Sequence, residues 1–222
     1  MQKKNKTPWP TKQAMQQVYA KQLWGSSGAE FFSGEGSHHP ELVIPYIEVL
    51  KTFLTSFKQP LVVADLGCGD FNIGKQLVQH TKQYIGVDIV PELIAHNIKT
   101  FKADNLQFQC LDIAQDQLPK ADCVIVRQVL QHLSNAEVQS VLNKLSNYKY
   151  IVLTEHVPQG DFVPNKDIIS GQGIRLKKQS GLDIIQPPFN FKVKTTTELL
   201  TIELNQNKGI IKTTLYQSIA TT

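Results

Sequence analysis

The segment that most constrains how this chain can fold is residues 61–74, LVVADLGCGDFNIG. A short apolar run at 61–64 stops at Asp65, and Gly67 and Gly69 follow directly. A short buried strand that leads into a glycine turn and then a helix is the unit that holds nucleotides in doubly wound folds. Glycine lets the backbone adopt positive φ and approach a ligand closely. Residues 61–74 therefore predict a strand, a turn and a helix that bind a nucleotide-like ligand.

Strand and helix patterns alternate along the rest of this region. Strands are predicted at 61–65, 83–88, 106–111, 121–127 and 149–154, and helices at 72–81, 91–102 and 134–147. Pro91 and Ser134 are typical helix-start residues. Two alternating segments at 197–204 and 209–217, joined by NQNKG, predict an antiparallel hairpin. The expected fold is α/β, with a doubly wound, mostly parallel seven-stranded sheet that ends in a C-terminal antiparallel hairpin.

We expect three regions along the chain. Residues 1–10 are a flexible tail, 11–58 hold the N-terminal helices and a lid-like loop, and 59–222 form the core, with an insertion at about 157–181. The loop at 24–40, WGSSGAEFFSGEGSHHP, is rich in glycine and serine but holds three bulky aromatic residues. Two interpretations stay open: a loop packed over the core, or a lid over a cofactor and substrate.

Composition argues against a membrane protein, a metal-binding protein and a nucleic-acid-binding protein. No apolar run approaches the roughly 20 residues that cross a bilayer, so no membrane association is expected. Three cysteines without CxxC spacing indicate reduced thiols, and with them a cytoplasmic location. The histidines lack paired ligand spacing, so no metal site is predicted. The net charge of +4 is scattered, and a basic surface with interleaved aromatic residues is missing, so nucleic-acid binding is not expected.

Three acidic residues at successive strand ends carry a resemblance to a known family. Asp65 opens the segment DLGCG, Asp88 ends the second strand in YIGVDIV, and Asp112 follows the third strand in CLDI. With the terminal hairpin, this ordered set resembles the class I S-adenosylmethionine (SAM)-dependent methyltransferases over about residues 61–217. Phe71 stands where the third glycine of the family pattern often occurs. GEGS at 34–37 and RQVLQHLS after the fourth strand are similar to a bacterial group without an assigned substrate.

The resemblance implies SAM as the cofactor and S-adenosylhomocysteine (SAH) as its product. It implies cofactor contacts at Asp65, Gly67, Cys68, Gly69, Asp70, Asp88, Ile89, Asp112, Ile113 and Arg127.

Each of these residues can bind a different part of the cofactor. Backbone N–H groups at 67–69 can face the methionine carboxylate, and Asp65 can accept a hydrogen bond from the methionine amine. Asp88 can accept from the ribose hydroxyls, and Asp112 from the adenine amine, between apolar walls at Ile89 and Ile113. NAD is the rival nucleotide, but its G-x-G-x-x-G pattern needs glycine at 72, where asparagine stands.

Catalytic candidates follow the fourth and fifth strands. Methyl transfer from a sulfonium needs mainly proximity and alignment, with a base where the nucleophile carries a proton. Arg127 can position an anionic substrate, form a salt bridge with a neighbouring acid, or clamp the backbone. His132 can act as a general base or cap the loop before helix 134–147, and His156 is a similar candidate.

The expected function is SAM-dependent methyl transfer to a small-molecule acceptor, such as a sugar or another cell-surface or secondary-metabolite precursor. The basic residues of the insertion, Arg175, Lys177 and Lys178, hint at an acidic substrate. The alternatives are methylation of a protein or RNA, and a non-catalytic protein of the same fold that binds a cofactor or partner. The oligomeric state is not indicated.

Overall fold

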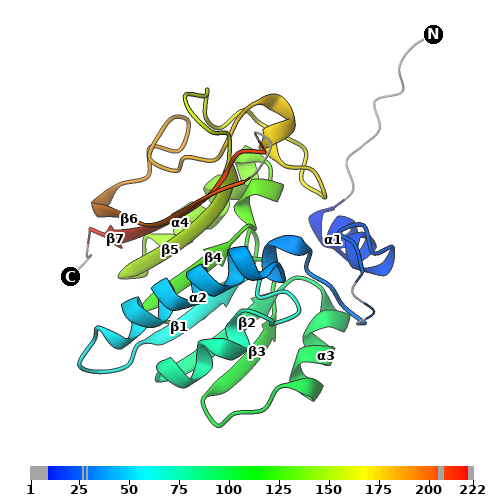
Figure 1. The fold of residues 1–222 in the computed structure, drawn as a ribbon, viewed down its shortest axis with the longest axis vertical. Helices are drawn as coiled ribbons and strands as arrows, with labels where there is room; N and C mark the ends of the chain where they lie inside the picture. Colours follow the sequence, from blue (N-terminus) through cyan, green and yellow to red (C-terminus); the bar gives the residue numbers. More distant parts are fainter. Residues whose placement is uncertain (1–9, 27, 29, 205–207, 220–222) are drawn as a thin grey trace.

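The computed structural model describes residues 10–26, 28, 30–204 and 208–219, and its centre is a seven-stranded sheet (Figure 1). The strand order is β3-β2-β1-β4-β5-β7-β6. The strands are β1 (Val62–Leu66), β2 (Gln83–Asp88), β3 (Leu106–Cys110), β4 (Cys123–Arg127), β5 (Tyr150–Val157), β6 (Val193–Glu203) and β7 (Ile210–Ser218). β1 to β5 are parallel, and β7 inserts antiparallel between β5 and β6. The predicted mostly parallel sheet with a terminal antiparallel hairpin is confirmed.

The position of β1 explains why its sequence is an unbroken apolar run. β1 pairs with β2 on one side and β4 on the other, so that Leu66 lies opposite both Val87 and Val126. Helices cover both faces of a parallel sheet, so its central strands are buried on both sides. The strand order changes direction at β1. The chain runs outward from β1 to β2 and β3 on one side, and then returns to β4 on the other side of β1. Such a switch point is where doubly wound sheets bind ligands.

The described residues form four α-helices: α1 (Thr11–Ala20), α2 (Pro40–Thr55), α3 (Pro91–Thr100) and α4 (Asn135–Leu145). Pro40 and Pro91 start α2 and α3 at the first helical position, where the missing N–H removes no hydrogen bond. Ser134 caps α4, since its hydroxyl accepts from the Glu137 N–H at 3.3 Å. The helix starts at Pro91 and Ser134 agree with the sequence prediction.

The helix predicted at 72–81 is wrong. Two short 3-10 turns, η2 (Gly74–Gln76) and η3 (Val78–His80), occupy this stretch. Phe71 has a φ of 62°, and its fully buried ring packs directly against Gly74, where a Cβ would collide with it. Because the Phe71 ring packs tightly against Gly74, the backbone makes a turn here and does not continue as a regular helix.

α2 and α4 lie on opposite faces of the sheet (Figure 1). α2 contributes Ile47, Leu50 and Leu54 to one core cluster, and α4 contributes Val141 and Leu142 to the other. A third, smaller cluster joins α1 and the aromatic loop that follows it to the start of α3. This third cluster holds the N-terminal region against the carboxyl end of the sheet.

The long connection between β5 and β6 is anchored by a buried arginine. Arg175, in the turn η5 (Arg175–Lys178), is 1% exposed. Its guanidinium donates to the carbonyls of Leu130 at 3.1 Å and Leu133 at 2.8 Å, and to Asn135 Oδ1 at 2.7 Å. The expectation that Arg175 forms part of a basic surface for an acidic substrate is therefore wrong, because its donors serve the loop between β4 and α4.

Two sequence predictions fall outside the described residues. The flexible tail at 1–10 is described only at Pro10, and most of the NQNKG loop, residues 205–207, is not described. Within the described part of the chain, no helix has both the length and the apolar character needed to cross a bilayer.

We predict that Arg175→Met lowers the free energy of unfolding by about 3 kcal/mol, because several buried carbonyls lose a charged donor. Urea denaturation followed by circular dichroism measures this change. Lys178→Met, an exposed change in the same turn, is the control and should change stability by less than about 0.5 kcal/mol. A loss below about 1 kcal/mol for Arg175→Met would show that the guanidinium does not anchor the loop.

Candidate functional site

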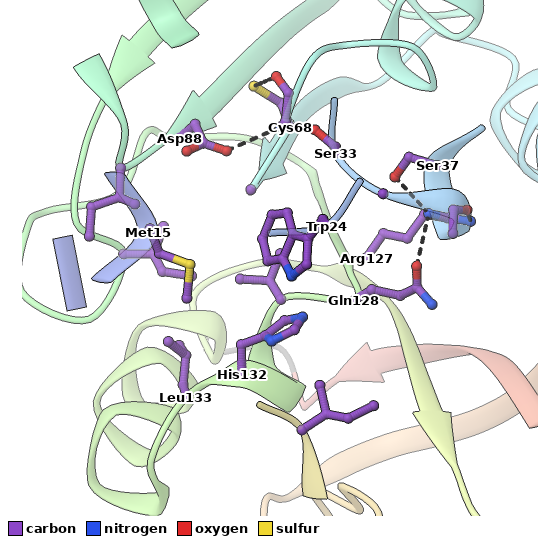
Figure 2. Close-up of a pocket in the computed structure, with 18 of the residues that line it drawn as sticks. Met15, Trp24, Ser33, Ser37, Cys68, Asp88, Arg127, Gln128, His132 and Leu133 are labelled. Atoms are coloured by element: carbon purple, nitrogen blue, oxygen red, sulfur yellow. Dashed lines mark hydrogen bonds between the residues drawn. The ribbon is translucent and has the colours of Figure 1, made fainter. Parts of the chain in front are cut away.

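A cavity of about 520 Å³ opens at the carboxyl ends of β1, β2 and β4. Its volume is within the range of ordinary small-molecule sites. Strand ends contribute Asp65, Asp88 and Arg127, and α1 and the loop after it contribute Met15, Tyr19, Trp24 and residues 33–37. Figure 2 shows Asp88, Trp24, Arg127 and His132 arranged around this space.

All three strand-end acids of the sequence prediction line this one cavity, as do Ile89 and Ile113. Asp88 Oδ2 accepts from the Gly69 N–H at 3.1 Å, and Oδ1 accepts from the Val90 N–H at 3.1 Å. A carboxylate oxygen has two lone pairs, so each keeps one for a ligand. Asp112 has a similar arrangement, because Oδ1 accepts from the Ala114 N–H at 2.9 Å.

Asp65 and Asp88 are buried by the protein itself. Burial raises the pKa of Asp65 to about 6, and a hydrogen bond from the Tyr84 hydroxyl at 2.8 Å opposes this shift. Burial also raises the pKa of Asp88 to about 6, against the hydrogen bonds from backbone N–H groups. Desolvation makes both charges costly. Ligand groups that donate hydrogen bonds would therefore stabilise the ionised forms.

The glycine loop lines the cavity but does not offer free N–H groups. The Gly67 and Cys68 N–H groups both donate to the Val87 carbonyl, at 2.7 and 2.9 Å. The Gly69 N–H is held by Asp88. The expectation that these three N–H groups face a carboxylate is therefore wrong. The cause is that the loop folds back on β2, and no α-helix follows it to present an N-terminus.

Asp70, predicted as a cofactor contact, does not line the cavity. Its Oδ2 accepts from the Ser33 N–H at 2.8 Å and contacts His38 Nε2 at 2.6 Å. In return, the Asp70 N–H donates to Ser33 Oγ at 2.8 Å. Asp70 thus ties the glycine loop to residues 33–38 of the aromatic loop through Oδ2, while its Oδ1 accepts from the Asn72 N–H at 3.2 Å.

Arg127 is also committed to this loop. Its guanidinium donates to the Gly36 carbonyl at 2.5 Å and to Ser37 Oγ at 3.4 Å, and lies 4.7 Å from the centre of the Tyr46 ring. Its Nε is buried and has no hydrogen-bond partner among the described residues. Arg127 therefore positions the loop, and its unpaired Nε–H is left as a donor for a ligand. We call residues 33–38 the lid segment.

The loop after β4 brings His132 to the cavity, and His156 lies elsewhere. The rings of His132 and Trp24 are 5.4 Å apart between centres. Burial lowers the pKa of His132 to about 4, so the ring is neutral at physiological pH. His156 does not line the cavity, and its Nε2 contacts the Lys208 carbonyl at 2.7 Å.

Several cavity residues were missed by the sequence reasoning. Met15, Tyr19 and Ser33 lie far from the glycine loop in the sequence, and Gln128 directly follows the predicted Arg127. Gln128 has a φ of 56°, and its side-chain amide lies so close to Gly36 that any Cβ there would collide. The one signal was the unusual aromatic content of loop 24–40, which suggested a lid but not its contacts.

The chain is similar to known methyltransferases. Residues 64–148 match the family model described as a methyltransferase domain. Among curated proteins, an uncharacterised RNA methyltransferase of Chlamydia pneumoniae is 27% identical over 146 residues. The match covers 62% of this chain and 35% of that protein, so the chain spans about a third of the length of this relative.

Solved methyltransferases share the fold. The N-methyltransferase NodS of Bradyrhizobium japonicum WM9, with SAH bound, superposes with a TM-score of 0.67 at 12% identity, covering 93% of this chain and all of that one. The magnesium protoporphyrin IX methyltransferase ChlM of Synechocystis PCC 6803, also with SAH, gives a TM-score of 0.55 at 15% identity, covering 94% of this chain and all of that one.

The domain match and the fold define the class. Residues 64–148 match a methyltransferase domain, and the chain shares its fold with the solved SAM-dependent methyltransferases. NodS and ChlM were both solved with SAH, the product form of the cofactor SAM, bound. The carboxylates with free lone pairs and the apolar walls of the cavity fit this cofactor.

We predict that Asp70→Asn speeds the release of SAH about tenfold, because an amide nitrogen cannot accept the hydrogen bonds that hold the lid segment, a loss of about 1.4 kcal/mol. Stopped-flow tryptophan fluorescence can follow this release, since Trp24 lines the cavity.

Asp104→Asn, an exposed change outside the lid segment, is the matched control and should leave the release rate unchanged. Equal release rates for the wild type and Asp70→Asn would contradict a role of Asp70 in holding the lid segment closed.

Proposed function

We propose that the protein transfers the methyl group of SAM to a small-molecule acceptor held under the lid segment. The observation that carries this proposal is one roofed cavity that extends from Asp88 and Asp112 to His132. Its walls are mostly apolar, with a few polar groups, as is usual for small-molecule sites. A cavity roofed by α1 and the lid segment favours a compact acceptor over a long polymer.

The cofactor-binding part of the cavity follows the strand ends. Asp88 would accept from the ribose hydroxyls, and Asp112 from the adenine amine between Ile89 and Ile113. The methionine end would meet opposite charges, with its amine at Asp65 and its carboxylate at the free Nε of Arg127. The attraction between Asp65 and Arg127 supports this pairing, since each acts on the pKa of the other.

The acceptor would occupy the part of the cavity bounded by Trp24, Gln128, His132, Ile174 and Lys177. Bound SAM supplies an electrophilic methyl group on a sulfonium, whose leaving group is a neutral thioether. Trp24 offers an apolar face, and Gln128 offers both a donor and an acceptor. A neutral His132 can take the proton that an acceptor hydroxyl or amine loses as its bond to the methyl carbon forms.

RNA methylation is the second candidate, and the relative from Chlamydia pneumoniae is the observation that favours it. That relative is about three times as long as the matched region, so its RNA-related parts need not be present in this chain. Exposed Lys166 and Lys178 border the same region as Lys177. A polynucleotide could contact these lysines while one base enters the cavity.

The two candidates can be separated by following the label from [methyl-³H]SAM in a cell extract treated with the purified protein. Label in the fraction below about 3 kDa supports a small acceptor. Label in acid-insoluble material that ribonuclease releases would overturn the small-molecule proposal and favour RNA. The Asp88→Asn variant is the control for label that does not depend on cofactor binding.

We predict that the affinity for SAH falls as the pH drops below about 6. Asp88 accepts hydrogen bonds best when ionised, and its pKa is raised to about 6. The dissociation constant should be steady from pH 7 to 8 and should rise by up to about tenfold per pH unit below 6. Titration calorimetry between pH 5 and 8 measures this.

Asp65, whose pKa is also raised to about 6, contributes to the same loss. Asp88→Asn should bind SAH more weakly at pH 8 and show a shallower pH dependence. An affinity that is constant from pH 5 to 8 would exclude an ionised Asp88 as the ribose ligand.

We predict that His132→Ala reduces kcat at least tenfold while the SAH dissociation constant changes less than about threefold, in the range of general-base effects. Once the labelled acceptor is isolated, steady-state kinetics give kcat, and calorimetry gives the affinity. His156→Ala is the matched control, since His156 lies outside the cavity. An unchanged kcat for His132→Ala would remove it as the base.

A further inference from the structure

We propose that Gln131 is a positioning residue that holds His132 in one neutral tautomer, with the proton on Nδ1 and the lone pair on Nε2. The role of this tautomer in catalysis rests on the proposed function, whereas the tautomer itself does not. Gln131 was not among the residues singled out from the sequence, and it does not line the cavity.

The first argument comes from Gly171, in the connection between β5 and β6. The Gly171 N–H donates to the His132 carbonyl at 3.0 Å, and the Gly171 carbonyl lies 3.2 Å from His132 Nδ1. A carbonyl oxygen can only accept, so Nδ1 must carry the proton. Gly171 thus fixes both the backbone and the ring of His132.

The second argument comes from the Gln131 side chain, which is 6% exposed. Its Oε1 accepts from the His156 N–H at 2.8 Å, and this backbone donor sets the orientation of the amide. The amide nitrogen is then directed at His132 Nε2, 3.4 Å away. An amide NH₂ can only donate, so Nε2 must be the acceptor. Gly171 and Gln131 therefore specify the same tautomer from opposite sides of the ring.

This arrangement also opposes protonation of the ring. A proton on Nε2 would point at the Gln131 NH₂, and two donors would face each other. Burial is the main cause that lowers the pKa of His132, and the charge of Arg175 lowers it further, whereas hydrogen bonds to the backbone of residues 171–173 oppose this shift. Glu155 lies next to Arg175, and Glu35 and Lys177 line the same cavity. Gln131 thus keeps Nε2 unprotonated. Because its NH₂ occupies the single lone pair of Nε2, this hydrogen bond must open before Nε2 takes the proton of an acceptor.

The test uses the full-length protein labelled with ¹⁵N-histidine, whose ring nitrogens report tautomer and protonation in long-range ¹H–¹⁵N spectra. The His132→Asn variant assigns the His132 signals. We expect the wild type to show the Nδ1–H tautomer from pH 6 to 8. An Nε2–H tautomer in the wild type would overturn the proposal, and this measurement needs no Gln131 variant to fold.

Two variants test the part played by Gln131. Gln131→Met removes the donor, and Gln131→Glu replaces it with a group that favours a proton on Nε2. The pKa of His132 should rise in the order wild type, Gln131→Met, Gln131→Glu, with a rise of at least one unit for the last. Gln139→Glu, a change at a half-buried position on α4, is the control and should not move it. An equal pKa in all of these proteins would overturn the proposal.

Kinetics separates this inference from the proposed function. With an isolated acceptor, Gln131→Glu should shift the acid limb of the kcat/KM profile to higher pH by the same amount as the pKa measured by NMR. A shifted pKa with an unshifted profile would overturn the catalytic role of Gln131. Absence of any methyl transfer by the wild type would instead overturn the proposed function and leave the tautomer assignment standing.

Discussion

The site depends on the attachment of the lid segment to the ends of the sheet, and Arg127 and Asp70 make that attachment. Arg127, at the end of β4, donates to the Gly36 carbonyl, and Asp70, in the glycine loop, holds Ser33 and His38. Both are charged groups in hydrogen bonds, which are stronger than neutral ones. Without them the cavity would lose its roof, since Trp24 and residues 33–37 form one of its walls.

The cavity contains buried carboxylates that have unused hydrogen-bond acceptors. Asp65 and Asp88 are buried together, and their pKa values are raised to about 6 by the loss of water. Buried carboxylates with unused lone pairs are common at binding sites, because a ligand with matching donors stabilises them. A zwitterionic methionine end and a ribose supply such donors. In the complex that we propose, Asp65 and Asp88 would accept these hydrogen bonds.

The connection between β5 and β6 supports the opposite side of the cavity. Arg175 holds the carbonyls around the turn η4 (Leu130–His132), and Gly171 fixes the His132 ring. Because this connection contacts the loop after β4 through buried, directional bonds, it sets the geometry of His132 more than it contributes charge to a substrate. The structure thus gives a mainly structural role to a segment whose lysines and arginine suggested anion binding.

Sequence alone determined the sheet and the acids at its edge. The apolar runs at 61–65 and 121–127 identify central strands, and Asp65, Asp88 and Asp112 follow because carboxyl ends of parallel strands share one edge. These features are local, so nearby residues specify them. Only the tertiary structure decided the hydrogen bonds of the glycine loop, the use of Asp70 and Arg127 by the lid segment, and the burial of Arg175. Each of these is a choice among partners tens of residues away, such as Ser33 for Asp70 or Leu133 for Arg175. A polar side chain binds whichever donor or acceptor packing brings within about 3 Å, and the sequence pattern carries no information on that distance.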